Sequence, residues 1–330
     1  VQKLFAAGIA AGEANFAKGI IGAPWFYNKI VFKKVQALLG GKLKFAGTGS
    51  APLAPKAQMF VQTAFNCPVR QGYGLTETCG ASCTQNACDN TSGVVGPPTA
   101  STVIKLKDWE EGMYKISDAN RPDIGMPRGE VLIGGPMVCM GYLVDKDKPD
   151  AEVVKKNAEE FSTCSLGHRW FHTGDIGQIT VDGQLQIIDR KKDLVKLQMG
   201  EYVALSKVEN ALKSSKYTAL PMVYATSTMS YAIALICPNV PNLKALAATL
   251  GVDADDVGAM CANKDVLAAV LKDVKETCAA AKLAKFEMPA KVILIEELWT
   301  PENDMLTAVQ KLKRREIVAK HKAAIDTVYV

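Results

Sequence analysis

The sequence predicts a chain of mixed α/β and α+β class that folds into two domains. Its 330 residues are long for one hydrophobic core, which favours two. Strand and helix patterns alternate through the first part of the chain, and a smaller α+β pattern follows residue 190. A hairpin signal and a basic run lie between them, within residues 170–205. We therefore place a larger domain at residues 1–190 and a smaller one at residues 191–330.

Composition is that of an ordinary globular chain, with 48% hydrophobic and 22% charged residues. The net charge of +5 is small for this length and does not indicate a nucleic-acid partner. No apolar run reaches the roughly 20 residues that a membrane span needs, which leaves peripheral association with a membrane surface open. Nine irregularly spaced cysteines favour a reducing, intracellular compartment of unknown organelle over a disulfide framework.

Apolar spacing and turn residues predict the elements of the larger domain. In chain order they are a surface helix within 1–39, a short strand at 42–46, an exposed turn at 47–53, a strand leading into a helix at 69–78, strand regions at 103–106 and 127–142, and helix or loop at 146–165. Residues 176–181 and 184–188 then alternate in polarity around Asp182-Gly183, a strong hairpin signal.

The same reasoning predicts the smaller domain. Its expected elements are a helix at 203–212 with Val208 and Leu212 inward, a hairpin of 222–225 and 231–237, a long amphipathic helix at 266–284, and a strand at 292–298.

Three short motifs carry residue types suited to nucleotide chemistry. Asp175 follows a flexible glycine, and one carboxylate can accept hydrogen bonds from two ribose hydroxyls. Thr76 and Glu77 lie at a glycine-rich turn, where a hydroxyl and a carboxylate can meet a phosphate and its Mg²⁺. Lys311 offers a flexible ammonium that could neutralise a carboxylate and a phosphate as they approach each other.

Each motif also has a structural interpretation. Residues 173–175 could be an ordinary turn, and residues 73–77 could be a helix cap with Tyr73 in the core. The basic run at residues 311–314 could be the solvated start of a helix.

A longer run sharpens the interpretation. DRKKDLVKLQMGEYVAL at residues 189–205, with Lys207-Val208-Glu209 following, resembles the domain junction of the adenylate-forming enzymes, and of the long-chain acyl-CoA synthetases in particular. GSAPL at 49–53, YGLTE at 73–77, TGD at 173–175 and the block at 127–142 resemble the same family, which gives that block a scaffolding role.

The resemblance implies an architecture. Residues 1–190 would be the carboxy-terminal part of the large AMP-binding domain, with mixed sheets, helices and a small β-barrel-like part. Residues 191–330 would be the small mobile α+β lid domain.

It also implies roles for individual residues. Tyr73 would stack on adenine, Thr76 would touch the α-phosphate, and Glu77 would hold the metal. The nucleotide-binding set would be Gly49, Ser50, Ala51, Tyr73, Gly74, Thr76, Asp175 and Arg190, with Arg190 a second ribose contact. Lys192 would be the hinge of the lid, and Gly200, Glu201 and Tyr202 would line the CoA path. The catalytic set would be Lys311, Thr76 and Glu77, with a second basic residue at Arg314.

The implied reaction is ATP-dependent activation of a long-chain fatty acid to acyl-AMP, followed by thioester formation with CoA, with Mg²⁺ as cofactor. The family's Ser/Thr/Gly-rich phosphate loop does not occur in these 330 residues, and the chain begins with Val1. We therefore expect a carboxy-terminal portion of a longer enzyme that is inactive alone. Two alternatives are another adenylate-forming acid:CoA ligase and a non-catalytic structural subunit that retains the fold.

One local departure from the family pattern concerns the catalytic lysine. Ala308, Val309 and Gln310 precede Lys311 where the long-chain enzymes carry a TPT-F/L-K pattern. The backbone that presents Lys311 is therefore expected to differ locally.

Overall fold

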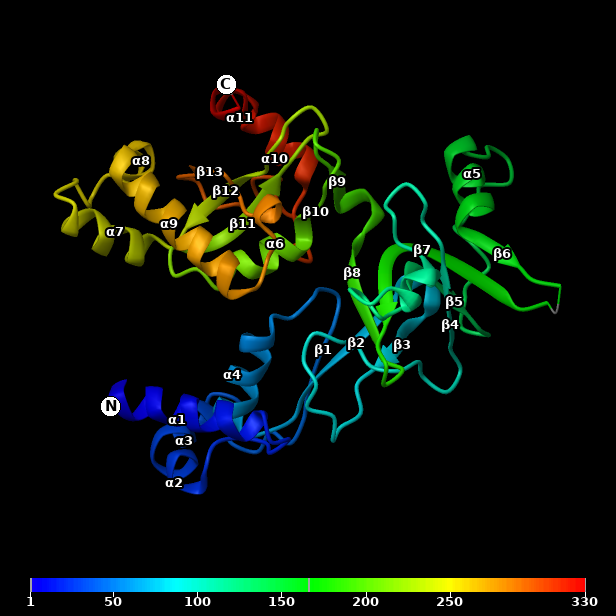
Figure 1. Cartoon of the computed structure of the whole chain (residues 1–330), viewed down its shortest axis with the longest axis horizontal. Coiled ribbons are helices and arrows are strands. Elements are labelled where there is room, and N and C mark those ends of the chain that lie inside the picture. The colour runs from blue at the N-terminus through cyan, green and yellow to red at the C-terminus, as the bar shows by residue number, and fades with distance from the viewer. Residues whose placement is uncertain (1, 166, 330) are drawn as a thin grey trace. The chain divides into compact units, whose positions relative to one another are not determined.

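A computed structural model describes residues 2–165 and 167–329. The chain divides into two compact units, one ending at Ile188 and the other beginning at Asp189 (Figure 1). This division lies two residues before the domain boundary predicted between residues 190 and 191.

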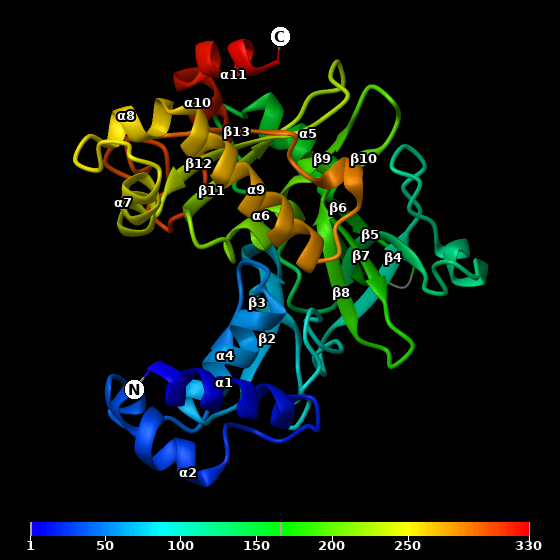
Figure 2. The ribbon, with the colours of Figure 1, turned by 60° about the vertical axis from the view of Figure 1, so that its left-hand side comes forward.

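Helices form the first part of unit 1. They are α1 (Gln2–Phe16), α2 (Trp25–Tyr27), a π-helical turn (Asn28–Phe32), α3 (Lys33–Ala37) and α4 (Pro55–Phe65). Helix α1 lies beside α4 (Figure 2), and a Cβ added at Gly12 would come within 2.1 Å of the Thr63 side chain. Glycine at this position therefore permits the close helix contact. The expected surface helix within residues 1–39 is present, although it is broken into several pieces.

A three-stranded sheet follows, with the order β1 (Ala46–Thr48), β2 (Val69–Leu75) and β3 (Gly80–Thr84). Strand β1 runs parallel to β2, and β3 runs antiparallel to β2. The prediction that residues 69–78 lead into a helix is wrong beyond Leu75. A single 3₁₀ turn, Thr76–Thr78, reverses the chain into β3, and Cys79 ends that turn with a left-handed φ of 52°.

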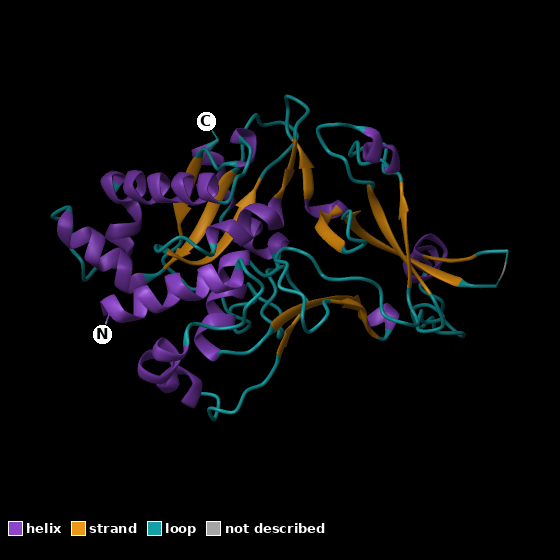
Figure 3. Cartoon of the chain, turned by 60° about the horizontal axis from the view of Figure 1, so that its bottom comes forward, coloured by secondary structure: helices purple, strands orange, loops and turns teal. Residues whose placement is uncertain are grey.

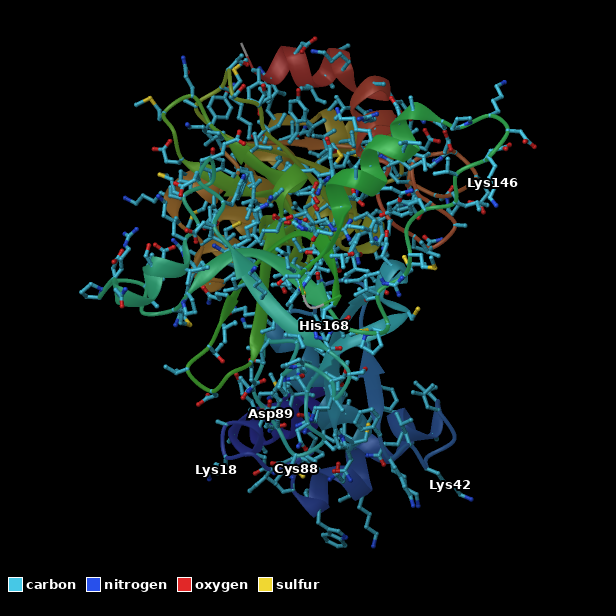
Figure 4. All side chains as sticks on the ribbon, turned by 90° about the vertical axis from the view of Figure 1, so that its right-hand side faces the viewer. Lys18, Lys42, Cys88, Asp89, Lys146 and His168 are labelled. Atoms are coloured by element: carbon cyan, nitrogen blue, oxygen red, sulfur yellow. The ribbon has the colours of Figure 1, made fainter. Side chains whose placement is uncertain are left out.

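Buried Arg70 connects β2 to the loop that follows β3. Its guanidinium donates hydrogen bonds to the carbonyl oxygens of Asn86 and Ala87. The loop thus held also contains Cys88 and Asp89, which Figure 4 labels.

The second sheet of the chain has five strands. They are β4 (Val103–Lys107), β5 (Arg128–Gly134), β6 (Phe161–Thr163), β7 (Arg169–Ile179) and β8 (Leu185–Arg190). The order is β4-β5-β7-β6, and β8 also pairs with β7. Figure 3 draws the strands of the chain in orange. Among the described residues β4 pairs only with β5, so the sheet remains open and the expected barrel-like part is not a closed barrel.

Two features of this sheet bear on the sequence predictions. The hairpin through Asp182-Gly183 is confirmed by the pairing of β7 with β8 and by Gly183 at a φ of 76°. The polar stretch at 146–165 contains helix α5 (Ala151–Glu160) and the short strand β6, which was not predicted. Lys146 lies on the loop before α5 (Figure 4). A 3₁₀ turn at Ile116–Asn120 lies between β4 and β5.

Unit 2 is built on two small sheets. Its strands are β9 (Leu194–Lys196), β10 (Tyr202–Ala204), β11 (Thr218–Tyr224), β12 (Ile233–Pro238) and β13 (Lys291–Leu294). Its helices are α6 (Leu205–Leu212), α7 (Val240–Thr249), α8 (Val257–Ala262), α9 (Lys264–Ala280), α10 (Arg314–Lys320) and α11 (Lys322–Val328), with 3₁₀ turns at Lys191–Asp193 and Lys285–Glu287.

The core of unit 2 follows the predicted periodicity. Strands β11 and β12 form the expected hairpin, and β13 joins β12 in parallel. Helix α9 buries Val266, Val270, Val274 and Cys278, which are four residues apart and therefore share one face. Helix α6 buries Val208 and Leu212 as predicted, whereas α7 and α8 were not predicted.

None of the helices in the described part of the chain combines the length and apolar character needed to cross a membrane.

Candidate active site

Two loops meet at one edge of the first sheet because β1 and β2 are parallel. Gly49, Ser50 and Ala51 follow β1 and are exposed, and Tyr73 and Gly74 lie near the end of β2. Ser50 has a left-handed φ of 68°, and a Cβ added at Gly49 would lie 3.3 Å from the Gly72 carbonyl oxygen. The exposed turn is therefore held beside the end of β2.

Tyr73 and Asp175, which are 102 positions apart, form a direct hydrogen bond. The Tyr73 hydroxyl donates to Oδ2 of Asp175 across 2.5 Å. Burial and the adjacent carboxylate raise the pKa of Tyr73 well above its ordinary value, so the phenol stays protonated and donates. The side chain expected to stack on adenine is thereby tied to the carboxylate expected to bind ribose.

The position of Asp175 is determined within β7. Its backbone amide donates to Oγ1 of Thr173 at 3.0 Å, and that hydroxyl donates to the Val131 carbonyl at 2.7 Å. Gly174 adopts a φ of 68°, and its amide donates to Oε1 of Glu130. Asp175 is only 3% exposed, so a ribose would have to approach a carboxylate that is largely covered.

Gly74 is required by the turn into β3. A Cβ added there would lie 1.8 Å from the Gly80 carbonyl oxygen, closer than any side chain can come. The turn leaves Thr76 exposed and Glu77 half-buried. The Glu77 carbonyl accepts a hydrogen bond from the Cys139 amide, which ties this turn to the segment after β5.

Tyr142 is a contact of Glu77 that the sequence did not reveal. Its hydroxyl oxygen lies 2.7 Å from Oε1 of Glu77 and 2.7 Å from Oε2 of Glu160. The Lys156 ammonium lies 4.2 Å from the centre of the Tyr142 ring. Because one phenol proton serves two carboxylates, Tyr142 donates to one of them at a time.

Tyr142 lies in the block at residues 127–142, for which the family resemblance implied only a scaffolding role. Tyr142 ends the GEV-I-GP-V-GY block, in which no residue was given a role beside Glu77. The contact of Tyr142 with Glu77 crosses 65 positions, so the sequence near either residue does not point to the other.

Glu77 fits the type of metal site that was predicted. Among the described residues no three or more His, Cys, Asp or Glu side chains gather to hold a metal by themselves. Mg²⁺ does not require such a cage, since it is commonly bound by one or two carboxylates together with substrate phosphates and water. Half-buried Glu77 beside exposed Thr76 meets this requirement.

In unit 2, Arg190 ends β8 and Lys192 lies in the 3₁₀ turn that follows, with both side chains exposed. Buried Asp189 accepts hydrogen bonds from the Arg190 amide at 2.7 Å and the Ser206 amide at 3.0 Å. Ser206 lies in the first turn of α6, so Asp189 caps an orphan donor of that helix. Burial raises the pKa of Asp189 to about 7, although these hydrogen bonds oppose the change.

The raised pKa predicts a pH-dependent stability. The protonated form of Asp189 is favoured by folding, so its stabilisation is complete below the unfolded pKa of about 4 and is lost as pH rises through about 7. Asp189→Asn should remove this dependence, and the stability of the wild type relative to the variant should fall by on the order of 3–4 kcal/mol between pH 4 and 8. Thermal unfolding across this range measures the difference, and exposed Asp182→Asn is the control. If stability depends on pH in the same way in Asp189→Asn and Asp182→Asn, the raised pKa of Asp189 is contradicted.

Gly200, Glu201 and Tyr202 lie in a hairpin that was not predicted. Strands β9 and β10 pair with Lys196 opposite Tyr202, and the Leu197 amide donates to the Glu201 carbonyl at 2.7 Å. Gly200 adopts a φ of 98° at the turn, which explains glycine at this position. The three residues predicted for the CoA path therefore share one tight turn and its second strand.

Lys311 lies in another tight hairpin. The Thr307 amide donates to the Lys311 carbonyl at 2.8 Å, and Gln310 turns the chain with a φ of 62°. The Lys311 side chain is exposed, whereas the Lys313 ammonium is paired with Asp304. The residues that depart from the family pattern therefore lie in a hairpin that exposes Lys311 and leaves Lys313 paired with Asp304.

Arg314 has a different environment from Lys311. Its guanidinium makes a two-pronged ion pair with Glu209, at 2.7 and 2.8 Å, and its Nε lies 3.3 Å from Oδ1 of Asp193. Burial alone would lower the pKa of Arg314, but the Glu209 and Asp193 carboxylates outweigh burial and raise it. Arg314 is therefore a charged group bound inside unit 2.

The structure thus groups the predicted residues within each unit. In unit 1 the Gly49–Ala51 turn, Tyr73 and Gly74 lie together at one sheet edge, and Tyr73 contacts Asp175. Thr76 and Glu77 follow directly on the next turn. In unit 2 the predicted residues lie at the end of β8, in the 3₁₀ turn Lys191–Asp193 and in two hairpins.

Residues 14–143 match the family model described as AMP-binding enzyme. The chain is 44% identical over 303 residues to long chain acyl-CoA synthetase 8 of Arabidopsis thaliana, covering 92% of this chain and 40% of that protein. It is 35% identical over 317 residues to human long-chain-fatty-acid–CoA ligase 1, covering 96% of this chain and 42% of that protein. The chain therefore spans about two fifths of the length of these relatives.

Among solved structures, the chain is similar to the A domain of carboxylic acid reductase from Segniliparus rugosus, in complex with AMP and a co-purified carboxylic acid. The TM-score is 0.72 at 26% identity, and the match covers 99% of this chain and 45% of that one. The predicted fold class, a part of an adenylate-forming domain followed by a small α+β unit, is confirmed apart from the barrel.

Proposed function

We propose that the chain supplies the nucleotide site and lid of a long-chain fatty acid:CoA ligase. The proposal rests on the match of residues 14–143 to the AMP-binding enzyme model and on the resemblance to long-chain acyl-CoA synthetases over more than nine tenths of the chain. Such an enzyme converts a fatty acid, ATP and CoA to acyl-CoA, AMP and pyrophosphate. The observation that supports this proposal most directly is the contact between Tyr73 and Asp175, which brings two separated motifs into one site.

The nucleotide is proposed to bind at the edge formed by β1 and β2. The Tyr73 ring, fixed by its hydroxyl, would offer a flat surface to adenine, and the turn at Gly49–Ala51 would offer backbone groups. Asp175 would accept from ribose, and Arg190 would be its second contact. The solved relative that holds AMP and a carboxylic acid supports a site of this kind.

In the first half-reaction, an oxygen of the fatty carboxylate attacks the α-phosphorus of ATP and pyrophosphate leaves. Thr76 would orient an α-phosphate oxygen, and Glu77 would hold Mg²⁺, which neutralises phosphate charge when bound. Lys311 would place its ammonium between the two anions as they approach each other. In the second half-reaction, the CoA sulfur displaces AMP from the acyl carbon.

The second half-reaction is proposed to follow rotation of residues 191–330 about Lys192. Lys192 lies exposed in the short 3₁₀ turn between β8 and β9, and a few backbone torsions there could absorb the motion. Gly200, Glu201 and Tyr202 would then line the path of the CoA arm. Tight turns such as theirs can present backbone groups to an extended ligand.

Asp175→Ala tests the nucleotide site in an active enzyme that contains these residues. We expect ATP binding to weaken by about 1.5–3 kcal/mol, because two ribose hydroxyls lose a shared charged acceptor. Calorimetric titration with ATP gives the dissociation constant. Tyr73→Phe is the companion variant, because it keeps the ring, removes only the hydroxyl that donates to Asp175, and should cause a smaller loss. An unchanged ATP affinity in Asp175→Ala would remove Asp175 from the site.

We also propose that residues 1–330 alone form no acyl-CoA, since they contain no Ser/Thr/Gly-rich loop for the β- and γ-phosphates. A panel of long-chain, medium-chain and aromatic acids would separate the proposed substrate class from another acid:CoA ligase. For location, the nine irregularly spaced cysteines support a reducing intracellular compartment, and attachment to a membrane surface remains part of the proposal.

A further inference from the structure

We propose that Asp193 and Arg314 are positioning residues that join the Lys311 hairpin to the pivot segment, which is the 3₁₀ turn Lys191–Asp193 that contains the proposed hinge Lys192. This inference rests on the proposed function, because it concerns how Lys311 is placed for adenylation. It assigns to Asp193 a role other than that of a solvated charge in a basic run.

The first step is the anchoring of Arg314. Both terminal nitrogens of its guanidinium donate to the Glu209 carboxylate, at 2.7 and 2.8 Å, and Nη1 also lies 3.3 Å from the Val223 carbonyl. Glu209 is 7% exposed and accepts a further hydrogen bond from the Val223 amide at 2.8 Å. A planar guanidinium held by a fork on a buried carboxylate has little freedom to move. Arg314 is therefore attached to α6 and β11.

The second step is the contact with the pivot segment. Nε of Arg314 lies 3.3 Å from Oδ1 of Asp193, the residue that immediately follows Lys192. The Asp193 side chain is 22% exposed, so solvent screens this contact only in part. Asp193 ends the 3₁₀ turn Lys191–Asp193, just before β9. Arg314 thus reaches the point at which the lid would begin to rotate.

The third step is the link from Arg314 to Lys311. Only two residues separate them, and the hairpin is closed by the Lys313 amide on the Met305 carbonyl and the Thr307 amide on the Lys311 carbonyl. Met305 and Leu306 are buried in the core of unit 2, so the base of the hairpin cannot slide. The direction of Lys311 therefore follows the orientation of Arg314.

Together these contacts join the pivot segment, α6, β11 and the Lys311 hairpin into one body. A rotation that starts at Lys192 then moves the Lys311 hairpin together with the pivot segment. Without the Asp193 contact, the segment after the pivot could turn by a small amount without carrying the hairpin with it. Since a misplacement of about 1 Å can cost on the order of 10² in rate, a looser link should reduce the Lys311-dependent step.

Asp193→Asn in an active enzyme containing these residues tests the inference, because it removes one charge and leaves the Arg314–Glu209 pair intact. We expect the rate of acyl-AMP formation, measured by pyrophosphate release, to fall about tenfold. This is within the loss of on the order of 10² that misplacement of a catalytic group can cause. Thioester formation from synthetic acyl-AMP and CoA should change by less than about twofold, because Lys311 is not used in that step. Asp193→Glu should restore part of the adenylation rate.

A double-mutant cycle with Lys311→Ala separates positioning from a general structural effect. If Asp193 acts through Lys311, Asp193→Asn should cost almost nothing further in the Lys311→Ala background. Asp304→Asn is the matched control, since it removes an acidic partner from the same hairpin at Lys313 and should leave both half-reactions unchanged.

Three results would overturn the inference. They are additive losses in the double variant, an equal slowing of both half-reactions by Asp193→Asn, and an unchanged adenylation rate in Asp193→Asn. If Lys311→Ala itself adenylates normally, the proposed role of Lys311 fails as well. If Lys311→Ala slows adenylation as expected and Asp193→Asn does not, only the positioning role of Asp193 is rejected.

Discussion

Lys311→Ala should lower the rate of acyl-AMP formation by on the order of 10² to 10³ in an active enzyme that contains these residues. This is the scale of losing one preorganised electrostatic contact in a transition state. The reason is that the Lys311 ammonium is proposed to lie between the attacking carboxylate and the α-phosphate, where two negative groups must approach each other. Pyrophosphate release measures this half-reaction directly.

The second half-reaction should largely survive this substitution. When the lid rotates about Lys192, the Lys311 hairpin is proposed to move away from the nucleotide. Synthetic acyl-AMP with CoA therefore tests a step that does not need the amine. Loss of both half-reactions in parallel would indicate damage to unit 2 rather than loss of a catalytic charge.

Lys313→Ala is the neighbouring control for this experiment. Its ammonium is paired with Asp304, whereas the Lys311 side chain is exposed at the turn. We therefore expect Lys313→Ala to change adenylation far less. If Lys313→Ala slows adenylation and Lys311→Ala does not, the catalytic lysine has been assigned to the wrong position in this hairpin.

Glu209→Ala should destabilise unit 2 by about 3–5 kcal/mol, the usual cost of leaving one member of a buried ion pair without its partner. Burial raises the pKa of Glu209, and the charge of Arg314 opposes that change. The substitution would leave the Arg314 guanidinium and the Val223 amide without their carboxylate. Chemical unfolding gives the free energy of unfolding.

Fluorescence can report this unfolding from unit 2 alone. Of the four tryptophans in the chain, only Trp299 belongs to unit 2, where it is 2% exposed. Replacing Trp25, Trp109 and Trp170 by phenylalanine leaves Trp299 as the reporter. Glu297→Ala is the control because its partner Lys320 is a partly exposed lysine, and exposed pairs contribute about 0–1 kcal/mol. Equal losses of unfolding free energy in the two variants would contradict the larger contribution expected of the buried Glu209–Arg314 pair.

Much of the local structure could be predicted because neighbouring residues determine it. Asp182-Gly183 favours a tight turn whatever surrounds it, and the observed pairing of β7 with β8 follows. Val266, Val270, Val274 and Cys278 repeat at helical spacing, so one face of α9 had to be buried. Family motifs added candidate residues that no propensity could supply.

Other features depended on contacts between distant segments. The residues after Leu75 were expected to form a helix, but pairing of β3 with β2 reversed the chain after a single turn. Likewise, the barrel-like part is an open sheet, because closure depends on which edge strands meet rather than on the pattern within any strand.

By itself, the sequence determined where charges and turns lie along the chain, including the carboxylate of Asp175, the tight turn before β8 and the amine of Lys311. Only the tertiary structure decided the partners of those groups. It placed Tyr73 on Asp175 across 102 positions and Arg314 on Glu209 across 105. The physical reason is that a turn depends on torsions of adjacent residues, whereas a buried charge or phenol must find a partner among the segments that packing brings beside it.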